Sequence, residues 1–244
     1  MPTKVLYENL TPDEFRACLA EAPIAYLPLG TLEWHGEHLP LGSDGIQSQG
    51  FFLELAQTVG GIVLPMLFLG PDMARSFKGQ DVYGMDIHGH PEGQPQRLDG
   101  SAYWLEDELF TRILKAVLKQ LSRAGFRIVV AHGHGPSTQL FQSHIETWRQ
   151  SFDLELFVCW RDDESDGLGI QTDHAAANET SLVMALRPDL VKMQNLSPNS
   201  EDWPLAVHGD DPRDHASAER GRKSIDMQLK RMEGLLRESL GQVR

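Results

Sequence analysis

Short apolar runs alternate with longer segments of helical character along this chain of 244 residues. Apolar runs at 23–29, 127–131 and 154–160 predict strands, and the first is continuous, as expected of a strand covered on both faces. Apolar residues recur at helical spacing over 101–124 and stop at Gly125, which predicts a helix. This alternation predicts an α/β fold: a three-layer α/β/α sandwich with a mainly parallel central sheet.

Local signals place the remaining elements. A capping-box pattern, Thr11 to Glu14, predicts a helix over 12–21. Further helices are predicted over 46–59, 137–150, from His174 to about 187, and over 216–240. A strand is predicted over 62–68, where Pro65 indicates an edge position. Residues 70–100 are rich in glycine and proline without a sustained period, so we expect a functional or disordered loop. We expect one domain over residues 1–244.

Composition narrows the classes of partner. The formal charge of −13 argues against nucleic acid, whose phosphates require a basic surface. No apolar run has the length of a membrane span, and the first residues lack the apolar core of a signal peptide. Cys18 and Cys159 are isolated and do not indicate a disulfide framework, which suits a reducing compartment. We therefore expect a cytoplasmic protein with a small-molecule partner.

The segment after the first predicted strand concentrates metal-binding side chains. Gly30 ends the apolar run, and Glu33, His35 and Asp44 follow. In an open α/β sheet, ligands bind beyond the carboxyl ends of the strands. Glu33 and His35 are two residues apart, so they point to the same side of an extended segment, and carboxylate with imidazole suits Zn²⁺, Mn²⁺ or Fe²⁺.

Three ordered motifs resemble the creatininase (creatinine amidohydrolase) family. The segment 30–40, which carries Glu-x-His-Gly-x-His-Leu-Pro and leads to Asp44, is similar to the signature of that family. The loop 132–137 (His-Gly-His-Gly-Pro-Ser) and the segment 174–191, with His174 five residues before a Glu-Thr-Ser sequence, resemble its other two motifs. The resemblance covers about residues 5–195 and implies an α/β/α fold. It also implies a homo-oligomer, which by resemblance to the family would be a hexamer.

The resemblance also implies a site with two divalent cations (Zn, Mn or Fe) per chain. It places Glu33 and His134 on one ion, His35 on the other, and Asp44 between the two. Creatininases use a glutamate two residues after the loop histidine, where this chain has Pro136. Glu179 of the Glu-Thr-Ser sequence is the expected substitute.

The same motifs suggest roles for the remaining histidines. His174 matches the catalytic histidine of the family and would protonate the leaving group. His132 stands where relatives have asparagine, and it would either ligate the metal or form a hydrogen bond to a ligand or to a loop carbonyl. His88 and His90 could reach the substrate from the 70–100 loop, whereas His38 is expected to support its own loop.

The resemblance implies a metal-dependent hydrolase in which activated water attacks the carbonyl of a small polar (cyclic) amide. Two alternatives stay open: a ring-opening carbon–carbon hydrolase that acts on a keto-inositol or similar cyclitol, like 3-dehydro-scyllo-inosose hydrolase, and a non-catalytic metal-binding relative. Because residues 70–100 contain many polar side chains, we expect a polar substrate and little activity on creatinine itself.

Overall fold

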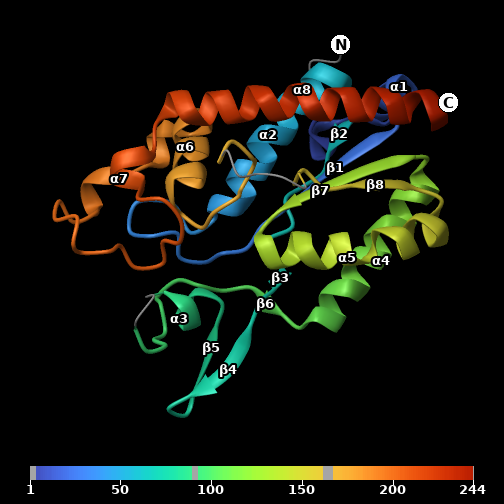
Figure 1. Cartoon of the computed structure of the whole chain (residues 1–244). Coiled ribbons are helices and arrows are strands. Elements are labelled where there is room, and N and C mark those ends of the chain that lie inside the picture. The colour runs from blue at the N-terminus through green and yellow to red at the C-terminus, as the bar shows by residue number, and fades with distance from the viewer. Residues whose placement is uncertain (1–3, 90–92, 162–166, 244) are drawn as a thin grey trace.

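A four-stranded parallel sheet forms the centre of the computed structural model (Figure 1), which describes residues 4–89, 93–161 and 167–243. The strands are β1 (Ile24–Leu29), β2 (Ile62–Val63), β7 (Ile128–Gly133) and β8 (Glu155–Phe157), in the order β2-β1-β7-β8. All three pairings are parallel. The two long strands, β1 and β7, are buried along their whole length and lie side by side at the middle of the sheet.

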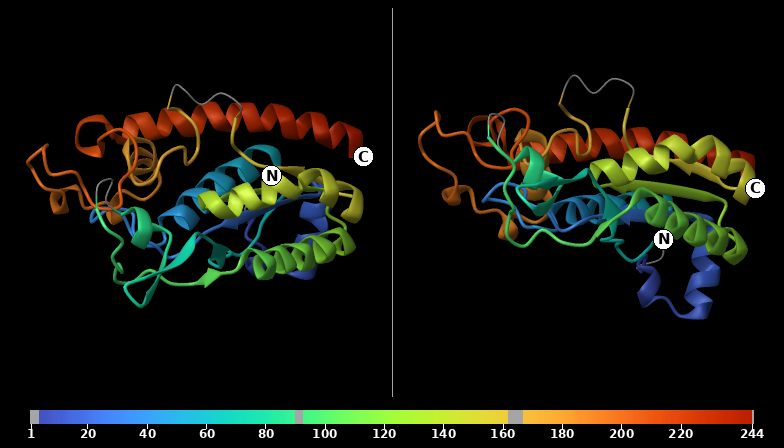
Figure 2. Two further views of the ribbon diagram at one scale, coloured as in Figure 1. Left: turned by 60° about the horizontal axis from the view of Figure 1, so that its bottom comes forward. Right: turned by 90° about the horizontal axis from the view of Figure 1, so that it is seen from below.

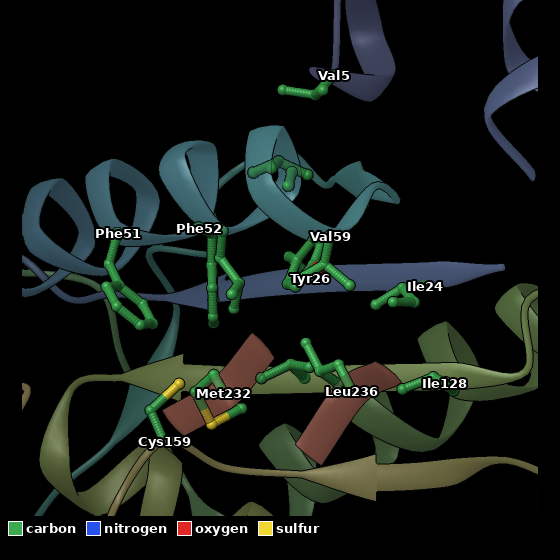
Figure 3. Packing of buried hydrophobic residues seen from close by; sticks show 14 of the residues in the cluster. Val5, Ile24, Tyr26, Phe51, Phe52, Val59, Ile128, Cys159, Met232 and Leu236 are labelled. Atoms are coloured by element: carbon green, nitrogen blue, oxygen red, sulfur yellow. The ribbon is translucent and has the colours of Figure 1, made fainter. Parts of the chain in front are cut away.

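Helices cover both faces of this sheet, as the views in Figure 2 show. The covering helices are α1 (Pro12–Glu21), α2 (Ser43–Val59), α4 (Asp107–Ala124), α5 (Gly135–Phe152), α6 (Ala177–Leu186) and α8 (Ala218–Val243). Alternate residues of β1 divide between the two faces. Tyr26 packs with Phe52 and Leu236 from α2 and α8 (Figure 3), whereas Leu27 packs with residues of α4 and α5. The predicted three-layer α/β/α fold is confirmed.

The register of β1 and β7 brings two predicted site segments to one edge. Leu29 pairs with Gly133, so both strands end at the same level. The loop that leads to α2 leaves β1 there, and the turn into α5 leaves β7 beside it. Helix α6 packs closely on α8. A Cβ on Gly221 of α8 would lie 1.9 Å from the carbonyl oxygen of Ser181 in α6. This close approach fixes α6 against α8.

The 70–100 segment is not the structureless loop that the sequence predicts. Its elements are β3 (Gly70–Pro71), a hairpin of β4 (Ala74–Phe77) and β5 (Gln80–Tyr83), and α3 (Met85–His88). β3 pairs in parallel with β6 (Trp104–Leu105). These elements are only two to four residues long, and the hairpin is largely exposed, so no apolar period could reveal them from the sequence.

Several predicted boundaries move. The second helix begins at Ser43 rather than 46, so Asp44 lies in its first turn. The helix predicted from 101 begins at Asp107, because Trp104 and Leu105 belong to β6. Of the strand predicted over 62–68, only Ile62 and Val63 form the regular strand β2. Beyond Pro65, Leu67 still forms backbone hydrogen bonds with Pro28 and Gly30, at the end of β1.

The remaining elements are short helices: η1 (Tyr7–Asn9), η2 (Pro188–Leu190), η3 (Met193–Asn195) and α7 (Pro212–His215). None of the helices in the described part of the chain has the length and apolar character needed to cross a bilayer. Both cysteines are buried, and neither is joined in a disulfide.

Candidate metal centre

The loop between β1 and α2 turns its two predicted ligands inward. Its course is fixed by backbone hydrogen bonds from Glu33 N–H to the Leu41 carbonyl (3.0 Å) and from Gly36 N–H to the Ala206 carbonyl (3.1 Å). Gly36 has a φ of +64°, and a side chain there would strike the His38 ring. Glycine is therefore required between the two histidines of the motif.

One group of predicted ligands forms around His134, at the end of β7. Glu33, Asp44 and His134 each place one ligand atom within 4.8 Å of the others. His134 Nε2 lies 3.5 Å from Glu33 Oε1, and its Nδ1 lies 2.9 Å from Ser137 Oγ. A hydrogen bond from Nδ1–H to Ser137 would leave the lone pair of Nε2 for a cation, in place of its 3.4 Å contact with Asp72 Oδ2.

A second group forms around His35 and shares Asp44 with the first. His35, Asp44 and Glu179 also place one ligand atom each within 4.8 Å of one another. His35 Nε2 lies 3.3 Å from Asp44 Oδ1 and 3.6 Å from Glu179 Oε2. The structure thus brings all five predicted ligands together in two groups, with the aspartate common to both.

Burial and unsatisfied atoms test whether a cation fits these groups. None of the five predicted ligand residues is more than 3% exposed. Among the described residues, neither Asp44 Oδ2 nor His35 Nε2 has a hydrogen-bond partner. Buried polar atoms are normally paired, because leaving one unpaired costs about 1–3 kcal/mol. Carboxylate and imidazole atoms left open inside a buried cluster are what a divalent cation of the Zn²⁺ or Mn²⁺ type would bind.

The pKa shifts of the predicted ligands also support a cation at this site. Burial raises the pKa of Glu33 to about 8 and raises the pKa of Glu179 well above its ordinary value. Burial alone would lower the pKa of His35, but the charges of Asp44 and Glu179 outweigh it and raise that pKa to about 10. Burial opposes the ionised form of Asp44 as well, yet His35 holds the pKa of Asp44 below its usual range. Without a cation the cluster therefore retains protons to balance its carboxylates.

Residues that the sequence analysis did not single out hold these ligands in place. Gln171 donates through Nε2 to Asp44 Oδ1 and to the Asp44 carbonyl, both at 3.2 Å. Asp173 accepts from the N–H groups of Asn178 and Glu179 at the start of α6, and Ala175 N–H donates to Glu179 Oε2 at 2.8 Å. These contacts link residues of no fixed spacing, so only the fold reveals them.

His174 lies beside the centre but does not begin a helix. Its backbone forms a bridge with His208, and α6 starts at Ala177. The His174 ring stacks on His35 with centroids 4.4 Å apart, and its Nε2 donates to the Trp34 carbonyl at 2.7 Å. Burial and the charge of His35 lower the pKa of His174 to about 3, so the ring is neutral at pH 7.

The other predicted histidines separate into different roles. His132 does not face the two groups: its Nδ1 accepts from Cys159 N–H, and its Nε2 donates to the Ile170 carbonyl at 3.1 Å. Because these backbone groups occupy both ring nitrogens, the prediction that His132 could ligate the metal or contact substrate is wrong in this structure. The alternative prediction, a hydrogen bond to a loop carbonyl, agrees with the contact to Ile170. His38 supports its loop, as expected, through a 2.8 Å contact with Thr180 Oγ1.

A cavity of about 350 Å³ opens onto both groups of predicted ligands. His174 lines it, and so does His88, which the sequence predicted near the substrate. His90 lies outside the described residues. Asp72, another residue of the 70–100 segment, also lines the cavity, although no spacing rule had marked it.

Comparisons with known proteins agree with this geometry. The sequence model of the creatininase family, described as creatinine amidohydrolase, matches residues 8–236. The chain is 25% identical over 216 residues to a creatinine amidohydrolase of Pseudomonas putida, which covers 80% of this chain and 77% of that protein.

Two solved structures share the fold over nearly their whole length. A structure named Creatininase Mn superposes with a TM-score of 0.74 at 20% identity, covering 98% of this chain and 99% of its own. A mutant creatininase of Zn-Zn type has a TM-score of 0.73 at 21% identity with the same coverage. With the family model matched across almost the entire sequence, the chain belongs to the creatininase family of hydrolases.

Proposed function

We propose that this hydrolase uses two divalent cations, Zn²⁺, Mn²⁺ or Fe²⁺, to cleave the C–N bond of a small polar amide. The shared aspartate is the observation that carries the proposal. Asp44 belongs to both groups of converging ligands, and one of its oxygens has no hydrogen-bond partner among the described residues. A carboxylate placed in this way can offer one oxygen to each of two ions. Glu33 and His134 would complete one site, and His35 and Glu179 the other.

Cations at these sites would polarise a substrate carbonyl and lower the pKa of bound water from about 15.7 toward about 7. The names of the Mn and Zn-Zn creatininases support the choice of metals.

His174 is the proposed proton carrier. Its Nε2–H is committed to the Trp34 carbonyl, so a transferred proton would travel on Nδ1. In this role His174 would take a proton from the attacking water and pass it to the departing nitrogen. Stacking on His35 and the backbone bridge to His208 hold the ring beside the ligands. This role therefore needs no movement of a loop.

The lining of the cavity supports a polar substrate. Carboxylates, imidazoles and the Gln171 amide surround the space, and no phenyl, phenol or indole ring lines it among the described residues. The flat face and the N-methyl group of creatinine would find few apolar contacts there, whereas amide and hydroxyl groups would find hydrogen-bond partners. Because the named relatives are amidohydrolases, C–N cleavage is better supported than opening of a carbon–carbon bond.

The decisive experiment is a substrate panel on protein stripped of metal and then reloaded with Mn²⁺ or Zn²⁺. The panel contains linear and cyclic polar amides, creatinine and a keto-cyclitol. We expect metal-dependent hydrolysis of at least one polar amide and little turnover of creatinine. Activity confined to the keto-cyclitol would refute C–N cleavage, and efficient creatinine turnover would refute the argument from the cavity lining.

Elemental analysis of the same samples shows whether the reloaded protein holds the metal on which the proposed mechanism depends. Elemental analysis should find close to two equivalents per chain after reloading and removal of excess metal. Protein that retains less than about a tenth of an equivalent would contradict the metal-dependent mechanism, whatever the substrate panel shows.

A further inference from the structure

The side chain of Gln171, in the wall of the cavity, has a fixed orientation. The residue is only 6% exposed. Its Nε2 donates to Asp44 Oδ1 and to the Asp44 carbonyl, both at 3.2 Å. Both of these partners are acceptors, so the opposite orientation of the amide would turn its own oxygen toward two other oxygens. The amide nitrogen therefore faces Asp44, and Oε1 is the end that remains for another partner.

The Oε1 atom of Gln171 is buried and has no hydrogen-bond partner in the part of the chain that the structure describes. An unpaired buried acceptor destabilises a fold, and native proteins rarely keep one unless a ligand or an ordered water pairs with it. The backbone of Gln171 is also unfavourable, because its φ is +57°. Non-glycine residues with such backbone angles are concentrated at functional sites. Two separate features thus indicate that Gln171 is kept for a ligand.

The surroundings of Gln171 indicate the kind of ligand. The residue lines the same cavity as His174 and as the predicted metal ligands Asp44 and Glu179. Because Oε1 can only accept a hydrogen bond, its partner must carry an N–H or O–H group. An amide whose carbonyl lies at the cations would bring an N–H on the adjacent nitrogen, beside the bond to be cleaved.

We propose that Gln171 determines specificity by accepting a hydrogen bond from the N–H of the amide substrate. This inference rests on the proposed function, since the substrate carbonyl must lie at the cations. One end of the Gln171 amide would then hold the shared aspartate, and the other end would hold the substrate. Primary and secondary amides, which carry a hydrogen on the nitrogen, are favoured over tertiary amides.

Binding of two hydroxamates to protein reloaded with Zn²⁺ tests the inference without turnover. Acetohydroxamate binds cations through its two oxygens and carries an N–H beside its carbonyl, whereas N-methylacetohydroxamate has a methyl group in place of that hydrogen. In calorimetric titrations, wild-type protein should bind acetohydroxamate about tenfold or more tightly than the methylated compound, because the latter leaves Oε1 unpaired. This ratio of affinities is the quantity to compare between variants.

Substitutions at Gln171 separate the hydrogen bond from the bulk of the methyl group. Gln171→Met has a side chain of similar shape without the acceptor, so its ratio should fall to about two or less. Gln171→Asn is the second variant: asparagine tolerates the left-handed backbone, and its shorter side chain withdraws the acceptor. Its ratio should fall as well. Gln139→Met is the matched control, because Gln139 is exposed on α5 and does not belong to the cavity lining. It should keep the wild-type ratio.

The outcomes distinguish this inference from the proposed function. Equal affinities of wild-type protein for the two hydroxamates would overturn the role of Gln171 and leave the proposed function standing. A full preference in folded Gln171→Met or Gln171→Asn would also overturn it, since steric exclusion of the methyl group would then explain the ratio. If neither compound binds wild-type protein that holds two cations, the proposed site of amide binding itself is refuted. Thermal melts and elemental analysis identify any variant that has lost its fold or its cations.

Discussion

Gly133 is the residue at which the fold and the candidate site can be tested together. It ends β7, pairs with Leu29 and precedes His134. Its φ is +146°, and a Cβ at this position would lie 1.7 Å from the Leu29 carbonyl oxygen. That oxygen also accepts the His134 N–H at 3.2 Å. Gly133→Ala would therefore force apart the two central strands at the point where they position a predicted ligand.

The structure sets the size of the effect. A non-glycine residue in a rarely populated backbone region costs about 1–3 kcal/mol, and overpacking of a tight interior contact costs about another 1–3 kcal/mol. The free energy of unfolding should therefore fall by about 2–6 kcal/mol. For a domain of this size, each kcal/mol shifts Tm by about 2–4 °C, so Tm should fall by about 4–24 °C.

Urea and thermal unfolding followed by circular dichroism measure this change on metal-free protein. Gly135→Ala is the control, because nothing lies within 4 Å of a Cβ there and the residue opens α5. Its stability should be unchanged or higher by about 0.4–1 kcal/mol. If Gly133→Ala were as stable as Gly135→Ala, the reasoning about the β1–β7 contact would be refuted.

Three further predictions concern the candidate centre. Asp44→Asn should weaken both cation sites, whereas His35→Ala should weaken only one; equal effects of the two variants in calorimetry would contradict a shared aspartate. His174→Ala should retain both cations but lose about 10²-fold or more in kcat on a true amide substrate, and unchanged kcat would remove it from the mechanism. Apparent cation affinity should rise roughly tenfold or more per pH unit between about pH 6 and 8, because the raised pKa values of Glu33 (about 8) and His35 (about 10) mean that binding must displace protons. A flat pH dependence would show that the metal-free cluster holds no such protons.

The sequence was informative where a regular period or a local motif determines structure. The continuous apolar run before Gly30 predicted the central strand, and the two-residue spacing of Glu33 and His35 predicted side chains on a common side. The same spacing failed for His132 and His134. Gly133, with its φ of +146°, breaks the strand geometry between them. His132 therefore turns to the backbone of Cys159 and Ile170, while His134 turns to the cavity.

Contacts between distant segments could not be predicted in this way. Gln171 supports Asp44 across 127 positions of the chain, and Asp72 approaches His134 across 62. Neither residue belongs to a periodic element, so no pattern separates it from other polar residues in loops. The single domain, the cytoplasmic location and the hexameric assembly stay predictions.

The energetic case for a cation rests on how much charge this fold buries. Three carboxylates and two imidazoles lie at the edge of the sheet almost without exposure to water. Taking ionised groups out of water costs several kcal/mol each, and their mutual attraction repays this cost only when every atom is paired. Here protons on Glu33 and His35 give partial compensation, yet Asp44 Oδ2 and His35 Nε2 have no hydrogen-bond partner among the described residues. Replacing those protons by divalent cations would pair the open atoms and neutralise the carboxylates. The same exchange would turn an arrangement that is costly for the metal-free protein into one prepared for hydrolysis.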